Sequence, residues 1–128
     1  MAYKIMLVED EVFIRELYEM VLEKEGYEVE AFADGNEAVA ALEKNAYDLV
    51  LLDIMLPGKD GIQILTDLRA MPSHKDTKVM MLTNLGNEHV VEKTNTLGIS
   101  GYVVKADNTP FQIVDRVKAV IGEVKAAS

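Results

Sequence analysis

The fold of this chain is decided by the stretch Asp48-Leu49-Val50-Leu51-Leu52-Asp53-Ile54-Met55-Leu56-Pro57-Gly58-Lys59-Asp60-Gly61. Four apolar residues, Leu49 to Leu52, follow one another without alternation, which is typical of a strand buried on both faces of a parallel sheet. They end in the carboxylate of Asp53, and Pro57-Gly58 and Gly61 then mark a tight loop before a helix. In open parallel sheets the ligand crevice lies just beyond the carboxyl ends of the strands. The strand therefore delivers Asp53 to a place that suits a nucleophile or a metal ligand.

Short apolar runs alternate with amphipathic segments along the rest of the chain, which predicts right-handed crossovers and a parallel sheet covered on both faces. We expect a three-layer α/β fold and one domain over residues 1–128, in which 125–128 are either a frayed tail or the start of a linker to a further part of a longer protein. The expected strands are Lys4–Val8, Glu28–Phe32, Leu49–Leu52, Lys78–Thr83 and Gly101–Lys105. Five helices follow them: one that ends near Lys24, one from Asp34 or Asn36, one from Gly61 that Pro72 closes, Glu88–Leu97, and one that starts at Thr109-Pro110.

Composition excludes several classes of protein. The chain has 22 Asp and Glu against 13 Lys and Arg, a net charge of −9, so we expect no direct contact with nucleic acid or anionic membranes. It contains no Cys, which rules out disulfides and zinc–thiolate sites. The first residues do not form a signal peptide, and no apolar run approaches the ~20 residues of a membrane span. We expect a cytoplasmic location.

Charged or hydroxyl side chains stand at the ends of four predicted strands: Glu9 and Asp10, Asp53, Thr83, and Lys105. In a doubly wound sheet of order 2-1-3-4-5, the first and third strands are neighbours, so the three carboxylates would crowd together. Such a cluster needs a counter-charge, and an oxygen-only set with room for water favours Mg²⁺ over Ca²⁺. With Lys105 as a second positive charge, the set is typical of a phosphoryl-acceptor site. Asp53 would attack in line, and Thr83 would hydrogen-bond a phosphoryl oxygen.

The chain resembles the receiver domain of two-component response regulators, of the chemotaxis-regulator kind, along its whole length. The resemblance rests on Glu9-Asp10, Leu51-Leu52-Asp53-Ile54-Met55-Leu56-Pro57-Gly58 with Gly61, Thr83, and Tyr102 followed by Lys105. It implies a flavodoxin-like (βα)5 fold and a histidine kinase or histidine phosphotransfer protein that phosphorylates Asp53. The domain would catalyse only its own phosphorylation and dephosphorylation.

The resemblance also implies a role for each matching residue. Glu9, Asp10, Asp53 and the backbone carbonyl of Met55 match the Mg²⁺ ligands, Thr83 and Tyr102 match the switch pair, and Lys105 matches the lysine that pairs with the phosphoryl group. Phosphorylation would then change the face formed by the fourth helix, fifth strand and fifth helix, which would bind a downstream protein. From the residues alone, Tyr102 is equally compatible with a core aromatic.

Two positions depart from the family pattern. Receivers usually carry a Pro after the lysine, with a cis bond before it, whereas this chain has Ala106. A cis bond before a non-proline costs about 2.5–4 kcal/mol, so the state of the Lys105–Ala106 bond stays open. The residue after Thr83 is usually small, whereas here it is Asn84. We expect Asn84 to alter the access of water or a phosphatase to the phosphoryl group.

Other readings of the same residues are weaker. Asp53 alone would suit a turn or a helix N-cap, and Glu11 suits a solvated helix start. A haloacid-dehalogenase-like phosphatase needs a second acid at position 55, which is Met55 here, and a flavodoxin would be repelled by the acidic first loop. An unphosphorylated receiver-like interaction module stays open. His74 and His89 show no ligand spacing, and we expect both at the surface.

Overall fold

The computed structural model describes residues 2–84, 92 and 97–122. Most of the expected helix Glu88–Leu97, together with His89 and the tail at 125–128, lies outside these residues. The strands are β1 (Lys4–Val8), β2 (Glu28–Phe32), β3 (Leu49–Asp53), β4 (Lys78–Thr83) and β5 (Gly101–Val104). The helices are α1 (Val12–Lys24), α2 (Gly35–Lys44), α3 (Gly61–Ala70) and α5 (Pro110–Ile121), with 3-10 turns η1 (Pro72–His74) and η3 (Lys105–Asp107).

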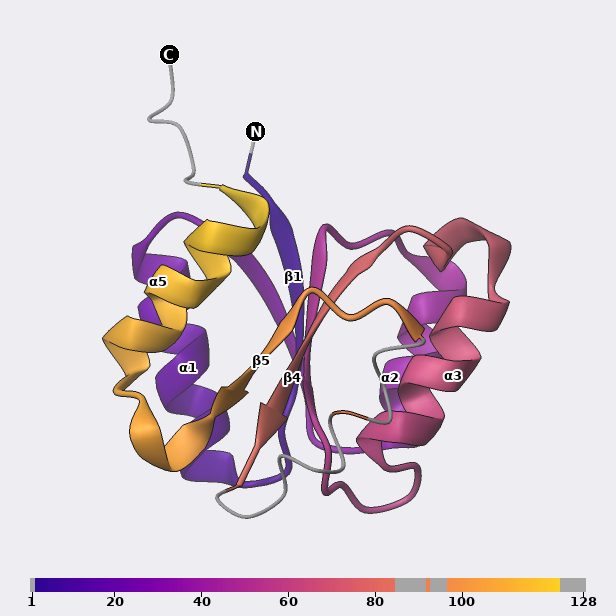
Figure 1. The fold of residues 1–128 in the computed structure, drawn as a ribbon, viewed down its shortest axis with the longest axis horizontal. Helices are drawn as coiled ribbons and strands as arrows, with labels where there is room; N and C mark the ends of the chain where they lie inside the picture. Colours follow the sequence, from indigo (N-terminus) through magenta and orange to yellow (C-terminus); the bar gives the residue numbers. More distant parts are fainter. Residues whose placement is uncertain (1, 85–91, 93–96, 123–128) are drawn as a thin grey trace.

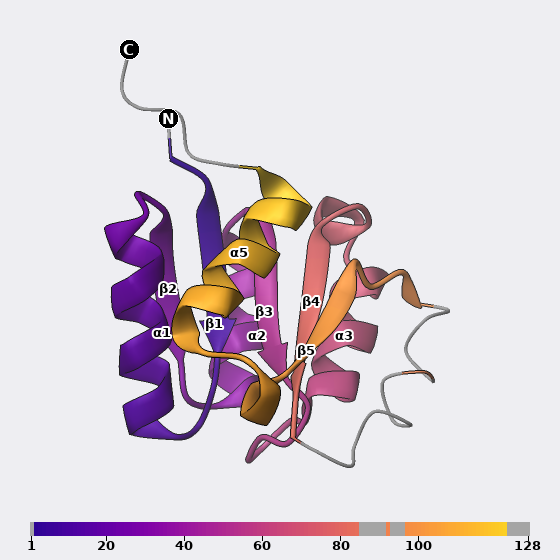
Figure 2. The ribbon, with the colours of Figure 1, turned by 60° about the vertical axis from the view of Figure 1, so that its left-hand side comes forward.

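All five strands run parallel in one sheet, in the order β2-β1-β3-β4-β5. Figure 2 shows this order across the sheet. In Figure 1, α1 and α5 cover one face of the sheet and α2 and α3 cover the other. The predicted three-layer fold, with its order 2-1-3-4-5, is confirmed. The carboxyl ends of the strands therefore meet at one edge of the sheet.

Alternate residues of the three central strands, β1, β3 and β4, belong to two separate hydrophobic cores, as the two-residue period of a strand requires. In β3, Leu49 and Leu51 pack with α1 and α5, whereas Val50 and Leu52 pack with α2 and α3. Because both faces of β3 are buried, its apolar residues do not alternate with polar ones. By the same period, Asp53 points to the side of the sheet that carries α1 and α5.

Side chains at the helix starts fix where three of the helices begin. Asp34 accepts from the backbone N–H groups of Asn36 and Glu37 at the start of α2. Asp60 with Gln63 forms a capping box at the start of α3, and Thr109 forms another at the start of α5. The expected capping signal at Thr109-Pro110 is confirmed. Each cap gives a partner to backbone donors that no helical bond satisfies.

The structure corrects two details. His74 is fully buried rather than at the surface, because its ring hydrogen-bonds to the carbonyl of Leu42 and to Thr77. Strand β5 ends at Val104, so Lys105 begins the 3-10 turn η3 instead of closing the strand.

No peptide bond of the described residues is cis, and the Lys105–Ala106 bond is therefore trans. Within these residues, no helix combines the length and apolar character needed to cross a bilayer.

Candidate functional site

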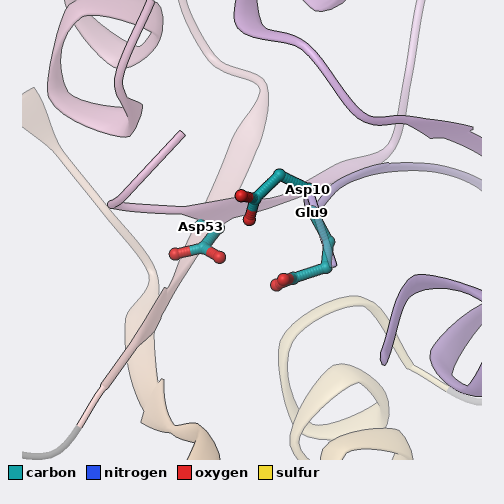
Figure 3. A group of neighbouring side chains, drawn as sticks. All are labelled: Glu9, Asp10 and Asp53. Atoms are coloured by element: carbon teal, nitrogen blue, oxygen red, sulfur yellow. The ribbon is translucent and has the colours of Figure 1, made fainter. Parts of the chain in front are cut away.

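Strands β1 and β3 place three carboxylates at the same edge of the sheet. Val8 on β1 pairs with Leu52 on β3, so the residues that follow them, Glu9 and Asp53, lie beside each other. The N–H of Glu9 donates to the carbonyl of Phe32 at 3.0 Å, which continues the ladder with β2. One oxygen each of Glu9, Asp10 and Asp53 lies within 4.8 Å of the others, and Figure 3 shows the three side chains gathered there. The structure thus brings Asp53 together with Glu9 and Asp10, from which it is far removed in the sequence.

Lys105 reaches two of these acids from the end of β5, which β4 separates from β3. Its Nζ donates to Oδ2 of Asp53 at 2.8 Å and to Oε2 of Glu9 at 3.0 Å. Glu9 is fully buried and Asp53 is only 2% exposed, whereas Asp10 is exposed. The 3-10 turn η3 gives Lys105 this reach, because it turns the chain at the end of β5.

The charges in the cluster do not balance. Burial, followed by the neighbouring Asp53 carboxylate, raises the pKa of Glu9 to about 7. Burial by itself lowers the pKa of Lys105, but the hydrogen bonds and charges of Asp53 and Glu9 outweigh it and leave that pKa above its usual value. One lysine thus faces three carboxylates, and the cluster favours an additional cation.

The donor set fits Mg²⁺ on this chemistry. All three side chains offer oxygen atoms, which hard divalent ions prefer, and Asp10 leaves one side of the cluster open to water. Oxygen ligands from one or two carboxylates plus several waters are the common form of a protein Mg²⁺ site. Receiver domains generally bind Mg²⁺ in an acidic pocket of this kind.

Backbone groups and a basic side chain hold the cluster in place. The N–H of Met55 donates to Oδ1 of Asp53 at 3.0 Å, so each oxygen of Asp53 has one donor. Nη1 of Arg15 donates to the backbone carbonyls of Glu9, at 3.0 Å, and Asp10, at 3.4 Å. Sequence reasoning assigned no role to Arg15. Its position in the sequence could have indicated this contact, because Arg15 lies one turn into the helix that follows Glu9 and Asp10.

Thr83 and Tyr102 lie on neighbouring strands at the same edge. Thr83 is buried and its hydroxyl donates to the carbonyl of Asn84 at 3.1 Å. Met81 pairs with Tyr102 and Thr83 pairs with Val104, so by the strand period Thr83 and Tyr102 point to the same face of the sheet. Tyr102 is 44% exposed and is therefore not a core aromatic.

A shallow apolar groove of about 370 Å³ runs beside Lys105, between α1 and the turn before α5. Its apolar lining includes Ile14, Leu17 and Pro110, and Asn84 and Ala106 stand next to Lys105 on its wall. Lys105 therefore contacts the acidic cluster and also lines the apolar groove.

Comparison with known proteins identifies the class. A family model described as the response regulator receiver domain matches residues 5–118. The chain belongs to this family of receiver domains. Receiver domains of response regulators signal together with histidine kinases.

Relatives of known name support this membership. The transcriptional regulatory protein SrrA of Staphylococcus aureus is 38% identical over 128 residues, which are 100% of this chain and 52% of SrrA. The chain thus spans about half the length of the curated relatives it matches. The chemotaxis response regulator CheY4 of Vibrio cholerae superposes with a TM-score of 0.87 at 28% identity, covering 94% of this chain and 99% of CheY4.

A third similar structure is the receiver domain of a sensor kinase. The receiver domain of the sensor histidine kinase PA1611 of Pseudomonas aeruginosa superposes with a TM-score of 0.84 at 28% identity, covering 96% of this chain and 100% of that one. Its structure contains a magnesium ion coordinated in the active site cleft.

Proposed function

We propose that Asp53 of this receiver domain accepts a phosphoryl group from a histidine kinase or a histidine phosphotransfer protein, in a reaction that requires Mg²⁺. The observation that carries the proposal is the buried carboxylate of Asp53, held between Lys105 and the N–H of Met55 and next to Glu9 and Asp10. The chain acts on no other substrate and catalyses only its own phosphorylation and dephosphorylation.

The residues of the site divide the chemistry between them. A carboxylate oxygen of Asp53 forms a bond to phosphorus, while the phosphorus–nitrogen bond of the phosphohistidine breaks and leaves its electron pair on the imidazole, which takes up a proton. Lys105, which already contacts Asp53, stabilises negative charge on the phosphoryl oxygens. Glu9, Asp10, Asp53 and the backbone carbonyl of Met55 would hold Mg²⁺, which supplies a Lewis acid that neutralises the same oxygens.

Phosphorylation then changes the surface around β5. The acyl phosphate at Asp53 carries about −1.5 to −2 charges in place of the single charge of the carboxylate, and the hydroxyl of Thr83 leaves the carbonyl of Asn84 to bond with it. Tyr102, which lies on the same face, turns into the space that Thr83 leaves. A shift from 1:99 to 99:1 needs about 5.5 kcal/mol of differential stabilisation, so the downstream protein supplies part of it.

The partners in this proposal are proteins. The phosphoryl donor approaches the acidic edge beside Lys105, where the apolar groove offers a contact surface. The downstream protein binds the surface formed by β5 and α5; the predicted fourth helix, 88–97, lies mostly outside the described residues. A net charge of −9 opposes contact with nucleic acid or anionic lipid, and we place the domain in the cytoplasm. Asn84 stays a prediction for the lifetime of the phosphoryl group; its exposed position next to Lys105 supports it.

The test is the intact mass of the protein after incubation with a small phosphodonor, with and without Mg²⁺, for the native chain and Asp53→Asn. We expect one added phosphoryl group that requires Mg²⁺ and is absent from the variant. Asp115→Asn is the matched control, because Asp115 is an exposed residue of α5, and it should form the adduct normally.

Two other outcomes would contradict the proposal. An adduct that persists in Asp53→Asn would mean that another residue is the nucleophile. The absence of any adduct from several donors would favour an interaction module that works without phosphorylation.

A further inference from the structure

Residues 54–60 follow Asp53, and we call them the β3–α3 loop. Two helices that pack against this loop, α2 and α3, each begin with a glycine. Gly35 is the first residue of α2, and Gly61 is the first residue of α3. Neither has a positive φ, so backbone conformation does not require glycine at either place. Glycine is also a poor helix former compared with alanine. Their presence therefore needs another physical reason.

The reason is close approach of the loop backbone. A Cβ at position 35 would overlap the carbonyl oxygen of Lys59 and lie 2.8 Å from its carbonyl carbon. A Cβ at position 61 would overlap the carbonyl oxygen of Asp53 itself. These are backbone atoms, which cannot rotate away as a flexible side chain would. The β3–α3 loop is therefore packed between two helix starts that tolerate no side chain.

The first turn of α2 and the turn at residues 57–59 also interlock through other groups. The N–H of Gly35 lies 3.4 Å from the carbonyl oxygen of Pro57, to which it donates. Gly58 has a φ of +76°, and a Cβ there would lie 2.8 Å from Nδ2 of Asn36 and 3.0 Å from Oδ2 of Asp34. Asp34 is itself held by the N–H groups of α2 that it caps. One side of the loop is thus set by α2.

The other side of the same loop holds the phosphoacceptor. The N–H of Met55 donates to Oδ1 of Asp53 at 3.0 Å, and the N–H of Ile54 donates to the carbonyl of Leu82 at 3.1 Å. The N–H of Gly61 closes the loop on the carbonyl of Ile54 at 2.9 Å. A displacement of Lys59 away from α2 is therefore transmitted over a few residues to the Met55 peptide.

We propose that Gly35 is a positioning residue for the phosphorylation site: its lack of a side chain lets α2 hold the β3–α3 loop where the Met55 peptide supports Asp53. The effect on Mg²⁺ rests on the proposed function, because it assumes that Asp53 and the Met55 carbonyl are ligands. The effect on the Met55 amide does not rest on it. Nothing in the sequence around Gly35 points to this role, since the contact joins positions 35 and 59.

The experiment compares the native chain with Gly35→Ala. We expect the added methyl group to push the loop outward, which moves the ¹H–¹⁵N resonance of the Met55 amide in the metal-free protein. We also expect the dissociation constant for magnesium chloride, measured by titration calorimetry, to rise about tenfold or more, as it does when support of a metal ligand is lost.

Two variants control for a loss of stability without a clash. Ala40→Gly weakens α2 on its exposed side, and Gly98→Ala strains a left-handed residue with a φ of +74° that is remote from the loop. Both should keep the Met55 resonance and the Mg²⁺ dissociation constant of the native chain, within about twofold.

A folded Gly35→Ala protein with an unmoved Met55 resonance and an unchanged dissociation constant would overturn the proposal. If Gly35→Ala fails to fold, Gly58→Ala presses on the same interlock from the loop side, and an unmoved Met55 resonance there would overturn it equally. A native chain that binds no Mg²⁺ would instead count against the proposed function, while the Met55 resonance would still decide the role of Gly35.

Discussion

Among the described residues, four polar or charged side chains other than tyrosines are buried, and they lie at two opposite edges of the sheet. Glu9, Asp53 and Thr83 lie at the carboxyl edge of the sheet. His74 lies in the turn before β4, at the opposite edge, and both of its ring nitrogens have partners. Nε2 donates to the carbonyl of Leu42 at 2.6 Å, and Nδ1 is hydrogen-bonded to the hydroxyl of Thr77 at 2.9 Å. His74 therefore connects the end of α2 to the turn η1.

Replacement of His74 by Phe should lower the free energy of unfolding by about 2 kcal/mol. The phenyl ring keeps most of the volume and the stacking on Tyr47, but the carbonyl of Leu42 and the hydroxyl of Thr77 lose their partner in a buried place. Urea unfolding of both proteins measures the difference. Ser73→Ala, in the same turn but exposed, should change the stability by less than about 0.5 kcal/mol. An equally small loss for His74→Phe would show that these two hydrogen bonds contribute nothing net.

In the proposed switch, two neighbouring strands would connect the site to the surface, because Thr83 on β4 and Tyr102 on β5 lie on the same face of the sheet. Thr83 ends β4 next to the edge where Asp53 ends β3, and Tyr102 lies on β5 across from Met81. Only the hydroxyl of Thr83 changes its partner in the proposed switch, from the carbonyl of Asn84 to the phosphoryl group. The response of β5 therefore depends on one hydroxyl group of β4.

Thr83→Ala should still form the Mg²⁺-dependent phosphoryl adduct, but Tyr102 should no longer respond to it. Without the hydroxyl there is no donor to draw β4 toward the phosphoryl group, so nothing opens the space for the Tyr102 ring. The measurement is the ring resonance of Tyr102 with and without the phosphodonor. Thr83→Ser keeps the hydroxyl and should keep the response. A full response in Thr83→Ala would rule out the proposed coupling.

Over the whole molecule, negative charge is in excess, and three of the acids lie together where the strands end. The net charge is −9, and three of the acids crowd at one edge with a single lysine between two of them. Burial and the nearby Asp53 raise the pKa of Glu9 to about 7, which shows that the folded state holds this charge at a cost. A cation that binds the folded state alone therefore stabilises the whole domain.

Mg²⁺ at ten times its dissociation constant should stabilise the native chain by about 1.4 kcal/mol, seen as a rise of several degrees in Tm. Thermal unfolding in Mg²⁺ and in a metal chelator measures the difference. Sodium chloride of the same ionic strength controls for screening of the surface charges. Asp53→Asn should respond less, because it removes one carboxylate of the set. An equal rise with sodium chloride would mean that screening, and no metal site, explains the effect.

Local pattern is enough to predict the five strands and the caps of the last helix, whereas the order of the sheet was taken from doubly wound folds and from the resemblance to receiver domains. The strands are short apolar runs, and parallel sheets with helical crossovers allow few arrangements of them. The three carboxylates and Lys105 were also within reach of the sequence, since each follows a strand and the strands end at one edge. Their roles in phosphorylation come from resemblance to the receiver family and stay predictions until the adduct is measured.

Contacts between segments far apart in the chain were decided by tertiary structure alone. His74 is buried because the carbonyl of Leu42, 32 positions earlier, lies where its ring can donate. Arg15 donates to the backbone carbonyl of Glu9, and Gly35 lies against the backbone carbonyl of Lys59. Contacts with backbone atoms do not depend on the type of side chain, so the sequence does not reveal them. A sequence pattern records which face of an element is apolar. The distance between two backbones is set only when the layers pack together, and at Gly35 that distance leaves no room for a methyl group.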